Sequence, residues 1–378
     1  MGHVSPDDTA PSSPPIYQTT AFDIPDLDVL AGLHSGAASG HIYTRDSNPN
    51  HSALGDSIAA LEGAEAGAAF SSGMGAISAV AMTLAGAGDH VIVARSLYGI
   101  TIKMLNRLRQ RFGIELSVVD ACDVDSVAAA VTDNTKFAIV ETVSNPLLEI
   151  VDLPKLASAL GDIPLVVDST FTTPELIRPI EHGAAIVVHS GSKYLNGHGD
   201  VMLGVAAGSA EAITRISSTA STFGQNANPF ECWLTQRGLR TLPLRMKHIV
   251  ETTTQLAAFL DQHDAVSRVF HASLPDHSTK ETAEQLYPNG TGGIIAFELK
   301  GGNKAAVNRL FRAVPEIPFS PTLADSRTTF SHPATTSHGF MAARECEAMG
   351  ITDGLVRLSV GLESFEQLKS ELERGLQS

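Results

Sequence analysis

The sequence predicts an α/β protein with a mostly parallel sheet, followed by a smaller C-terminal α+β domain. Between residues 56 and 210, helical patterns alternate with short runs of β-forming residues. These runs are continuously apolar, which is typical of parallel strands covered by helices on both faces. Near residue 240 this regular alternation of helices and strands ends. One long helical pattern then precedes a few further strands and helices. Two domains are therefore expected.

The first of these domains is expected to span residues 51–240 and the second residues 241–378, after an extended arm at 1–50 that is rich in Pro, Ser, Gly and Asp. In the first domain we expect helices at 56–66, 75–85 and 101–111, and strands at 90–94, 137–142, 164–168, 184–189 and 203–207. In the second we expect helices at 244–263, 303–314 and 364–375, and strands at 293–299 and 354–360.

The composition narrows the class of partner. A formal net charge of −15 argues against nucleic acid and anionic membranes, because no basic surplus exists to neutralise phosphates. Three widely spaced cysteines without a CxxC pair suggest a reducing cytoplasm. The N-terminus lacks the pattern of a signal peptide. Residues 67–88 carry no charge and are long enough to span a bilayer, but they are rich in Gly, Ala and Ser and lack basic or aromatic flanks. We therefore expect a buried helix packed on a sheet there.

Polar residues follow several of the expected strands, at the sheet edge where open α/β folds place their active sites. Asp168 directly follows an apolar run, where a carboxylate needs a partner. It is either a cap or turn residue or the partner of a buried cationic ring nitrogen. Lys193 follows the next run, and a desolvated lysine there is a nucleophile able to form a Schiff base. Ser190 and Ser192 beside it offer hydroxyl donors to an anion.

A Ser-Ser-Gly-Met-Gly turn at 71–75 precedes an expected helix, whose first backbone N–H groups form an anion site. It is not a dinucleotide fingerprint, because Ser78 replaces the last glycine and no strand pattern precedes it. No GK[ST] follows either, so a single phosphate fits best. Tyr98 is either a core residue or an exposed ring available for stacking. His189 and His198 lack metal-site spacing and are expected to be structural.

A lysine nucleophile, a buried aspartate, a stacking tyrosine and a monophosphate site together fit pyridoxal 5′-phosphate (PLP). The chain resembles the Cys/Met-metabolism family of PLP enzymes, which includes cystathionine γ-synthases, cystathionine γ- and β-lyases, methionine γ-lyases and homoserine-ester sulfhydrylases. The resemblance runs from PPIYQT at 14–19 to VRLSVGLE at 356–363. It implies the type I aminotransferase-like fold and a homotetramer built from two catalytic dimers.

The resemblance implies a role for each matching residue. Lys193 in SKYLNGHGD matches the Schiff-base lysine, Asp168 in VVDST the ring-nitrogen partner, and Tyr98 in SLYG the stacking tyrosine. Ser169 stands where the family usually has Asn. Asn145 in ETVSNP matches the residue near the phenolic oxygen of the cofactor. The phosphate cradle corresponds to Ser72, Gly73, Met74, Ser190 and Ser192.

Two further matches concern the neighbouring subunit and the substrate. Tyr43 and Arg45 in YTRDSNP match a pair that reaches the phosphate of the adjacent subunit, which would make the arm a dimerisation element. Arg357 in VRLSVGLE matches the arginine that grips the substrate α-carboxylate, a task suited to a bidentate guanidinium. The substrate site is expected to comprise Arg357, Thr322 and Tyr43.

The reaction is expected to take place at Cγ of a homocysteine-type amino acid, as γ-elimination like that of cystathionine γ-lyase. γ-Replacement by a cystathionine γ-synthase or an O-acetyl- or O-succinylhomoserine sulfhydrylase stays open, as does methionine γ-lyase activity. Ile100 stands where methionine γ-lyases typically have cysteine. Arg327 replaces a glutamate common in cystathionine enzymes, and it resembles the sulfhydrylases, as does HPATTSH at 332–338. A nucleotide-binding oxidoreductase and a non-catalytic α/β scaffold are the alternatives from other classes.

Overall fold

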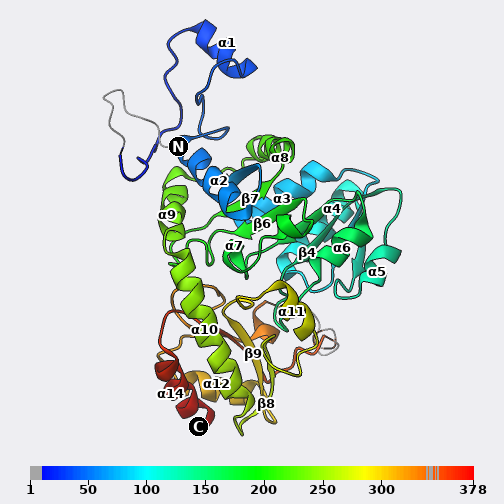
Figure 1. The fold of residues 1–378 in the computed structure, drawn as a ribbon, viewed down its shortest axis with the longest axis vertical. Coiled ribbons are helices and arrows are strands. Elements are labelled where there is room, and N and C mark those ends of the chain that lie inside the picture. The colour runs from blue at the N-terminus through cyan, green and yellow to red at the C-terminus, as the bar shows by residue number, and fades with distance from the viewer. Residues whose placement is uncertain (1–10, 338, 340–343, 345, 347–348) are drawn as a thin grey trace.

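A seven-stranded sheet organises the N-terminal half of the computed structural model, which describes residues 11–337, 339, 344, 346 and 349–378 (Figure 1). Its strand order is β1-β7-β6-β5-β4-β2-β3. The strands from β3 across to β6 are parallel to their neighbours, whereas β7 is antiparallel to both β6 and β1. The strands are β1 (Ala66–Phe70), β2 (His90–Ala94), β3 (Glu115–Val119), β4 (Thr135–Glu141), β5 (Leu165–Asp168), β6 (Ile186–Ser190) and β7 (Gly204–Gly208). The expected mostly parallel sheet is confirmed.

Helices pack against this sheet because its central strands are apolar on both faces: every residue of β2 and β7 is buried. The helices of this half are α2 (Pro49–Glu62), α3 (Gly73–Leu84), α4 (Gly99–Phe112), α5 (Val124–Ala129), α6 (Leu153–Leu160), α7 (Thr173–Leu176), the 3₁₀ helix η1 (Pro179–His182), α8 (Ala210–Phe223) and α9 (Pro229–Leu239). Helix α2 crosses β1 closely. A methyl carbon on Gly55 would lie 2.3 Å from the carbonyl oxygen of Gly67, so both positions need glycine.

A four-stranded sheet of order β10-β11-β9-β8 forms the C-terminal half, and all of its neighbours are antiparallel. Its strands are β8 (Val266–Phe270), β9 (Ile294–Leu299), β10 (Thr329–Ser331) and β11 (Leu355–Ser359). The accompanying helices are α11 (Lys280–Leu286), α12 (Lys304–Ala313), the 3₁₀ helix η2 (Pro333–Thr335) and α14 (Phe365–Leu376). This antiparallel sheet with its helices has the expected α+β character.

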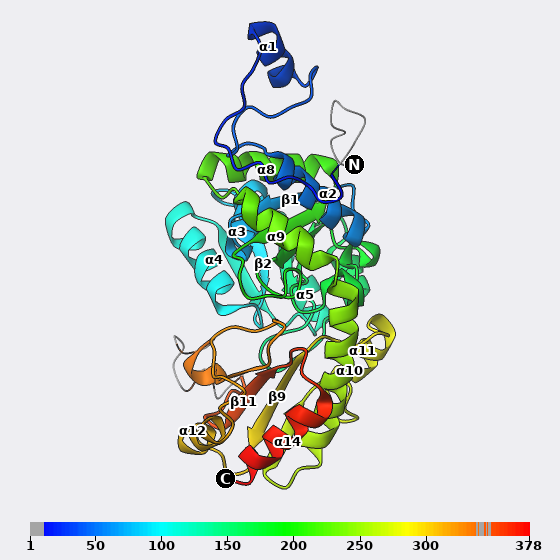
Figure 2. The ribbon, with the colours of Figure 1, turned by 90° about the vertical axis from the view of Figure 1, so that its left-hand side faces the viewer.

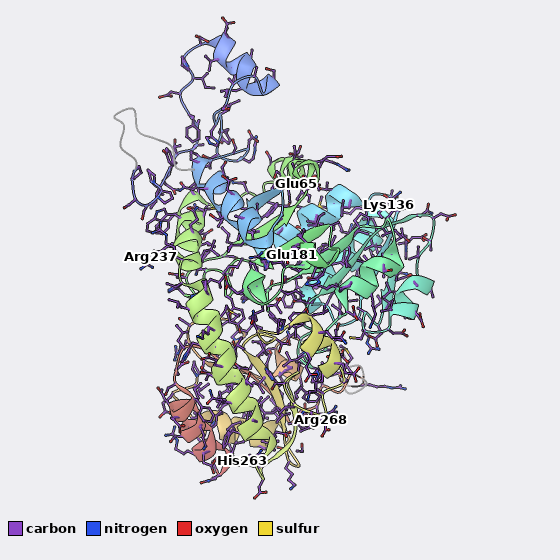
Figure 3. The ribbon with its side chains drawn as sticks, in the orientation of Figure 1. Glu65, Lys136, Glu181, Arg237, His263 and Arg268 are labelled. Atoms are coloured by element: carbon purple, nitrogen blue, oxygen red, sulfur yellow. The ribbon has the colours of Figure 1, made fainter. Side chains whose placement is uncertain are left out.

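Helix α10 (Leu242–Asp261) runs between the two sheets (Figures 1 and 2). Near its start, Met246 and Ile249 belong to the hydrophobic core of the large sheet. Near its end, Leu256 and Leu260 belong to the core of the small sheet. His263, just beyond α10, lies 3.7 Å from the carboxylate of Glu373 on α14, at the far end of the molecule (Figure 3).

The N-terminal arm extends away from the body of the chain and carries α1 (Leu27–Ser35), a helix without a buried residue (Figure 1). The composition of residues 1–50 predicts an extended arm and not this helix. Leu27 is 81% exposed. The base of the arm is held by the indole of Trp233, whose Nε1–H donates to the carbonyl of Pro14 at 2.9 Å. Residues 1–10 of the arm lie outside the described residues.

Two expectations about residues 67–88 are wrong. The stretch is not one helix, because its first residues form β1 and only 73–84 form α3. A strand therefore does precede the Ser-Ser-Gly-Met-Gly turn. Its sequence, Ala-Gly-Ala-Ala-Phe, contains no β-branched residue, and so it lacks the usual composition of a strand. In the part of the chain that the structure describes, no helix is long and apolar enough to cross a membrane.

Candidate active site

The carboxyl ends of β4, β5 and β6 form one edge of the large sheet, and the polar residues singled out in the sequence gather there. Glu141 of β4 pairs in register with Asp168 of β5, and Asp168 pairs with Val188 of β6. The turn that follows β6 carries Lys193. Arg357 approaches this edge from β11 of the small sheet, so the candidate site lies between the two halves.

Lys193 is held in a tight turn with its amine turned toward the small sheet. Its Nζ donates to Oγ1 of Thr322 at 3.1 Å. Burial, together with the positive charge of Arg357, lowers the pKa of Lys193, and Asp325 opposes the shift. A lysine with a lowered pKa has a larger share of the neutral amine that acts as a nucleophile or base.

Asp168 is oriented by the residue two positions after it. The backbone N–H and the hydroxyl of Thr170 both donate to Oδ1 of Asp168, at 3.0 and 2.5 Å. The Thr170 hydroxyl in turn accepts the backbone N–H of Ser190 at 2.9 Å. Burial raises the pKa of Asp168, and the two Thr170 hydrogen bonds oppose the increase. A cationic partner would favour the ionised carboxylate further.

Tyr98 lies at the start of α4 with 42% of its surface exposed, as expected of a ring available for stacking rather than of a core residue. Its backbone N–H donates to Oε1 of Glu141 at 2.8 Å. Glu141 is a strand-end residue to which the sequence analysis gave no role. This hydrogen bond fixes the backbone of Tyr98 relative to the strand next to Asp168.

The start of α3 lies against the end of β6. Ser72 is the N-cap of α3, and its hydroxyl accepts the N–H of Gly75 at 3.0 Å. A methyl carbon on Gly73 would lie 3.0 to 3.2 Å from the backbone and side chain of Ser190, so glycine lets the two segments approach closely. Met74 accepts a hydrogen bond from Thr101 through its sulfur at 3.7 Å. The first N–H groups of α3 are oriented to bind an anion.

Ser192 differs from Ser190 in what its hydroxyl contacts. It accepts the backbone N–H of Leu203 at 2.9 Å and lies 3.3 Å from the Leu203 carbonyl, to which it donates. In this structure Ser192 joins the turn after β6 to the start of β7. Ser190 remains the nearer hydroxyl to α3.

Arg357 is 3% exposed and connects the other groups of the site. Its Nη1 donates to Oδ1 of Asn145 at 3.1 Å, and its Nη2 donates to the carbonyl of Thr322 at 3.2 Å. Its Nε is buried and has no hydrogen-bond partner. Burial lowers the pKa of Arg357 to about 10, so it remains cationic near neutral pH. An unpaired guanidinium N–H in a buried site suits a carboxylate ligand.

Tyr43 and Arg45 lie elsewhere, in the arm. Both are exposed, and the guanidinium carbon of Arg45 lies 5.3 Å from the centroid of the Tyr43 ring. The arm with α1 extends from the body of the chain at the end opposite the small sheet (Figure 2). One chain therefore does not bring this pair together with the other candidate site residues.

His189 and His198 have local partners of the kind expected of structural histidines. His189 is buried on β6, and its Nε2 lies 2.6 Å from Oε1 of the buried Glu62. His198 is exposed, and its Nδ1 lies 2.6 Å from the carbonyl of Asn196. Across the described ranges, no group of three His, Cys, Asp or Glu side chains could hold a metal ion.

Arg245, on α10, is a supporting residue that the sequence analysis missed. It is 5% exposed and donates to the carbonyls of Tyr194 at 2.7 Å, Leu195 at 3.3 Å and Gly238 at 3.0 Å. It thereby fixes the backbone immediately after Lys193. Nothing in its local sequence indicates the contact with the turn, because the carbonyls of Tyr194 and Leu195 lie about fifty residues earlier. A cavity of about 850 Å³ lies apart from this site, between α7, α10 and α11.

The comparisons with known proteins show the family of this chain. The family model described as "Cys/Met metabolism PLP-dependent enzyme" matches residues 2–377. The chain belongs to this family. It is therefore a PLP-dependent enzyme, and the interpretation as an oxidoreductase or a non-catalytic scaffold is wrong. The family members share the type I fold that the sequence resemblance implied.

Individual relatives differ in the reaction they carry out. The chain is 38% identical over 364 residues to an O-succinylhomoserine sulfhydrylase of Pseudomonas aeruginosa, covering 96% of this chain and 90% of that protein. It is 38% identical over 369 residues to an L-methionine γ-lyase of Porphyromonas gingivalis, covering 96% and 92%. A crystal structure of cystathionine γ-synthase from Xanthomonas oryzae pv. oryzae, in complex with aminoacrylate and cysteine, has a TM-score of 0.90 and 34% identity, covering 97% and 92%.

The residues at the sheet edge fit PLP. The start of α3 approaches Ser190 so closely that a side chain on Gly73 would crowd it, which leaves the helix N–H groups open to a phosphate. Asp168 is a half-buried carboxylate able to pair with a ring nitrogen, and burial lowers the pKa of the Lys193 amine. The donor set is that of PLP enzymes rather than of a metal or dinucleotide site.

Proposed function

We propose that this enzyme catalyses trans-sulfuration chemistry at Cγ of homocysteine-type amino acids, with γ-elimination to a 2-oxo acid and ammonia as its first reaction. The observation that carries the proposal is the link from Lys193 through Thr322 to Arg357. The lysine amine donates to the Thr322 hydroxyl, and the Thr322 carbonyl accepts from Arg357. An amino acid whose carboxylate lies on Arg357 then presents its Cα to the amine of Lys193.

Each residue has a defined task in this proposal. PLP, when bound, supplies the electron sink that makes the Cα and Cβ protons acidic. The free N–H of Arg357 binds and orients the substrate carboxylate. Lys193 removes the Cα proton and then moves a proton at Cβ. Asp168 pairs with the ring nitrogen, and the Tyr98 phenol donates a proton to the departing γ-group.

The remaining site residues position the cofactor and the substrate. Ser72, Gly73, Met74 and Ser190 would hold the phosphate, with Ser192 supporting the turn. Asn145 would lie near the phenolic oxygen of the cofactor. In the structure its side-chain oxygen accepts a hydrogen bond from Arg357. With cystathionine as substrate, cleavage of the Cγ–S bond and addition of one water give cysteine, 2-oxobutyrate and ammonia.

Arg327 favours γ-replacement as a second candidate function. The Arg327 side chain is exposed, in the same loop as Thr322. Among the described residues it has no ion pair. A free cation there suits an anionic leaving group, such as the succinyl carboxylate of O-succinylhomoserine, and disfavours the distal ammonium of cystathionine. The sulfhydrylase relative acts, by its name, on O-succinylhomoserine. His338, part of the second motif resembling the sulfhydrylases, lies outside the described residues.

A product assay tests the proposal. The holoenzyme is offered cystathionine, methionine and homocysteine, and also O-acetyl- or O-succinylhomoserine with a thiol, and 2-oxobutyrate and thioether products are measured. Faster 2-oxobutyrate formation from cystathionine supports elimination, whereas faster thioether formation supports replacement. Arg327→Glu is expected to shift the preference toward cystathionine. Arg309→Glu changes another exposed arginine, on α12 outside the proposed site; it is the matched control for the charge change and is expected to leave the preference unchanged.

We further propose a cytoplasmic homotetramer built from two catalytic dimers. The exposed arm, with Tyr43 and Arg45, would complete the phosphate site of the neighbouring subunit. The proposal also assigns cofactor binding to residues 51–240 and the smaller domain to 241–378. Size-exclusion chromatography with light scattering tests the assembly.

A further inference from the structure

Two carboxyl groups lie side by side behind the candidate cofactor site. Glu141 and Asp168 end neighbouring parallel strands and pair in register, so their side chains point to the same face of the sheet. Adjacent strands lie about 4.8 Å apart. At that separation, at two half-buried positions, two carboxylates cannot both be ionised at little cost, and one of the two retains a proton.

The hydrogen-bond donors around the pair decide which carboxyl is ionised. Asp168 accepts two hydrogen bonds from Thr170, one from its backbone N–H and one from its hydroxyl. Both contacts favour the anion. Glu141 accepts only one N–H, that of Tyr98, and its Oε2 is buried without any hydrogen-bond partner. A protonated oxygen directed toward Asp168 is the species that such an environment stabilises.

The single hydrogen bond of Glu141 has a specific target. Tyr98 precedes the first residue of α4, and no side chain of its own caps that helix. The Glu141 carboxyl therefore holds the backbone at the point where the Tyr98 ring extends into the exposed edge of the site. Burial, and then the charge of Asp168, raise the pKa of Glu141 well above its ordinary value, in agreement with this geometry.

We propose that Glu141 is a positioning residue that acts as a neutral carboxylic acid: it holds Tyr98 over the cofactor and leaves Asp168 as the ionised carboxylate for the ring nitrogen. The inference rests on the proposed function for the roles of Tyr98 and Asp168. It goes beyond that function in two ways. It assigns the shared proton of the Glu141–Asp168 pair to Glu141, and it gives a positioning role to a residue that does not itself react. Glutamine reproduces the shape and charge of a neutral glutamic acid, so the substitution distinguishes the two protonation states.

The first measurement is infrared difference spectroscopy of the holoenzyme at neutral pH. The C=O stretch of a protonated carboxylic acid is expected in the wild-type protein and absent from Glu141→Gln. Glu149→Gln is the matched control, because Glu149 is half-buried beyond the same strand but contacts neither Tyr98 nor Asp168. If the protonated-acid band is absent from the wild type, Glu141 is ionised and the inference is wrong.

The second measurement is the pH titration of the visible absorbance band of bound PLP. In Glu141→Gln we expect the midpoint to move by less than about 0.3 pH units, because no charge is lost. Removing an ionised neighbour would move it by roughly one unit or more. Glu141→Asp, whose side chain is too short to reach the Tyr98 N–H, is expected to bind PLP about tenfold more weakly. Equal PLP affinity in Glu141→Asp and the wild type would refute the positioning role.

Failure of this inference and failure of the proposed function give different results. If Asp168→Asn and Lys193→Ala keep wild-type PLP affinity and spectra, the proposed roles of those residues fail, whatever the infrared result for Glu141. If Asp168→Asn and Lys193→Ala both lose PLP affinity and the wild-type spectra, the proposed roles of those residues stand. If Glu141→Gln at the same time shifts the titration midpoint by a full unit, the inference that Glu141 is neutral is wrong.

Discussion

Lys193 and Asp168 show how burial changes two neighbouring groups in opposite directions. Desolvation disfavours the charged form of each, so it lowers the pKa of the lysine and raises that of the aspartate. The lysine gains the neutral amine that its proposed task needs. The aspartate, in contrast, needs help to remain an anion, and the two hydrogen bonds from Thr170 provide it.

Thr170 is therefore expected to control cofactor binding on the acid side. Thr170→Val removes the hydroxyl donor, which raises the pKa of Asp168 further. Since the pKa of Asp168 in the folded protein is already raised, its anion is lost as the pH falls, and in the variant this loss begins at a higher pH. We expect PLP affinity to decrease about tenfold and its acid limb to move upward. Thr170→Ser, which keeps the hydroxyl, is the control, and an identical loss in both variants would contradict the role of the hydroxyl.

The Glu62–His189 pair is expected to support the sheet rather than the chemistry. Both side chains are fully buried and 2.6 Å apart, so removing one leaves the other without its partner. His189→Ala is expected to lower the free energy of unfolding by about 3 kcal/mol. Urea denaturation measures this loss, with the exposed His198→Ala as control. A change of less than about 0.5 kcal/mol in His189→Ala would show that the pair contributes little.

The candidate site residues could be singled out in the sequence because they follow recognisable apolar strands or lie in specific motifs. Asp168 and Lys193 belong to the first kind, and Tyr98 and Arg357 to the second. Arg245 and Thr170 could not be predicted, since their roles depend on which backbone groups the fold brings beside them. The hydrogen bond of Glu141 with the backbone N–H of Tyr98 could not be predicted for the same reason, although Glu141 itself lies at an expected strand end.

At the scale of elements, the central strands β2, β4, β5, β6 and β7 of the large sheet were predicted, whereas its edge strands β1 and β3 were missed. Strand β1 consists of alanine, glycine and one phenylalanine, and β3 is an edge strand of mixed exposure. The strand at 90–94 was predicted with its observed bounds. The helix expected at 56–66 begins at Pro49, because Asn48 caps it and Pro49 starts its first turn.

The junction of α3 with β6 is expected to be the most sensitive point for phosphate binding. Gly73→Ala places a methyl group 3.0 Å from Ser190, which forces the helix start away from the strand end. We expect PLP affinity to decrease at least about tenfold, because charge-assisted hydrogen bonds from the helix N–H groups are lost. Fluorescence titration with PLP measures this change. Unchanged affinity with an intact fold would mean that the phosphate lies elsewhere.

At the scale of the whole molecule, the arm determines how many chains one site needs. Tyr43 and Arg45 lie far along an exposed segment, whereas Lys193 lies in the body of the chain. If the arm completes the neighbouring site, Arg45→Ala and Lys193→Ala affect different halves of that site.

Subunit mixing tests this division. Arg45→Ala and Lys193→Ala enzymes, each nearly inactive, are unfolded, mixed in equal amounts and refolded. About half of the catalytic dimers are then mixed, and each holds one intact site of two, so about a quarter of wild-type activity is expected. Mixing each variant with itself is the control. No recovery above the separate variants would place Arg45 and Lys193 in the same chain's site.

Helix α10 links the core of the small sheet to the turn that carries Lys193. Its twenty residues form a rod about 30 Å long. Arg245 joins one end to the turn that carries Lys193, and Leu256 and Leu260 embed the other end in the small core. A displacement of the small sheet would therefore be transmitted along this helix to the turn that carries Lys193. A substitution in the core of the small sheet, remote from any substrate, can therefore change the reactivity of Lys193 without contacting it.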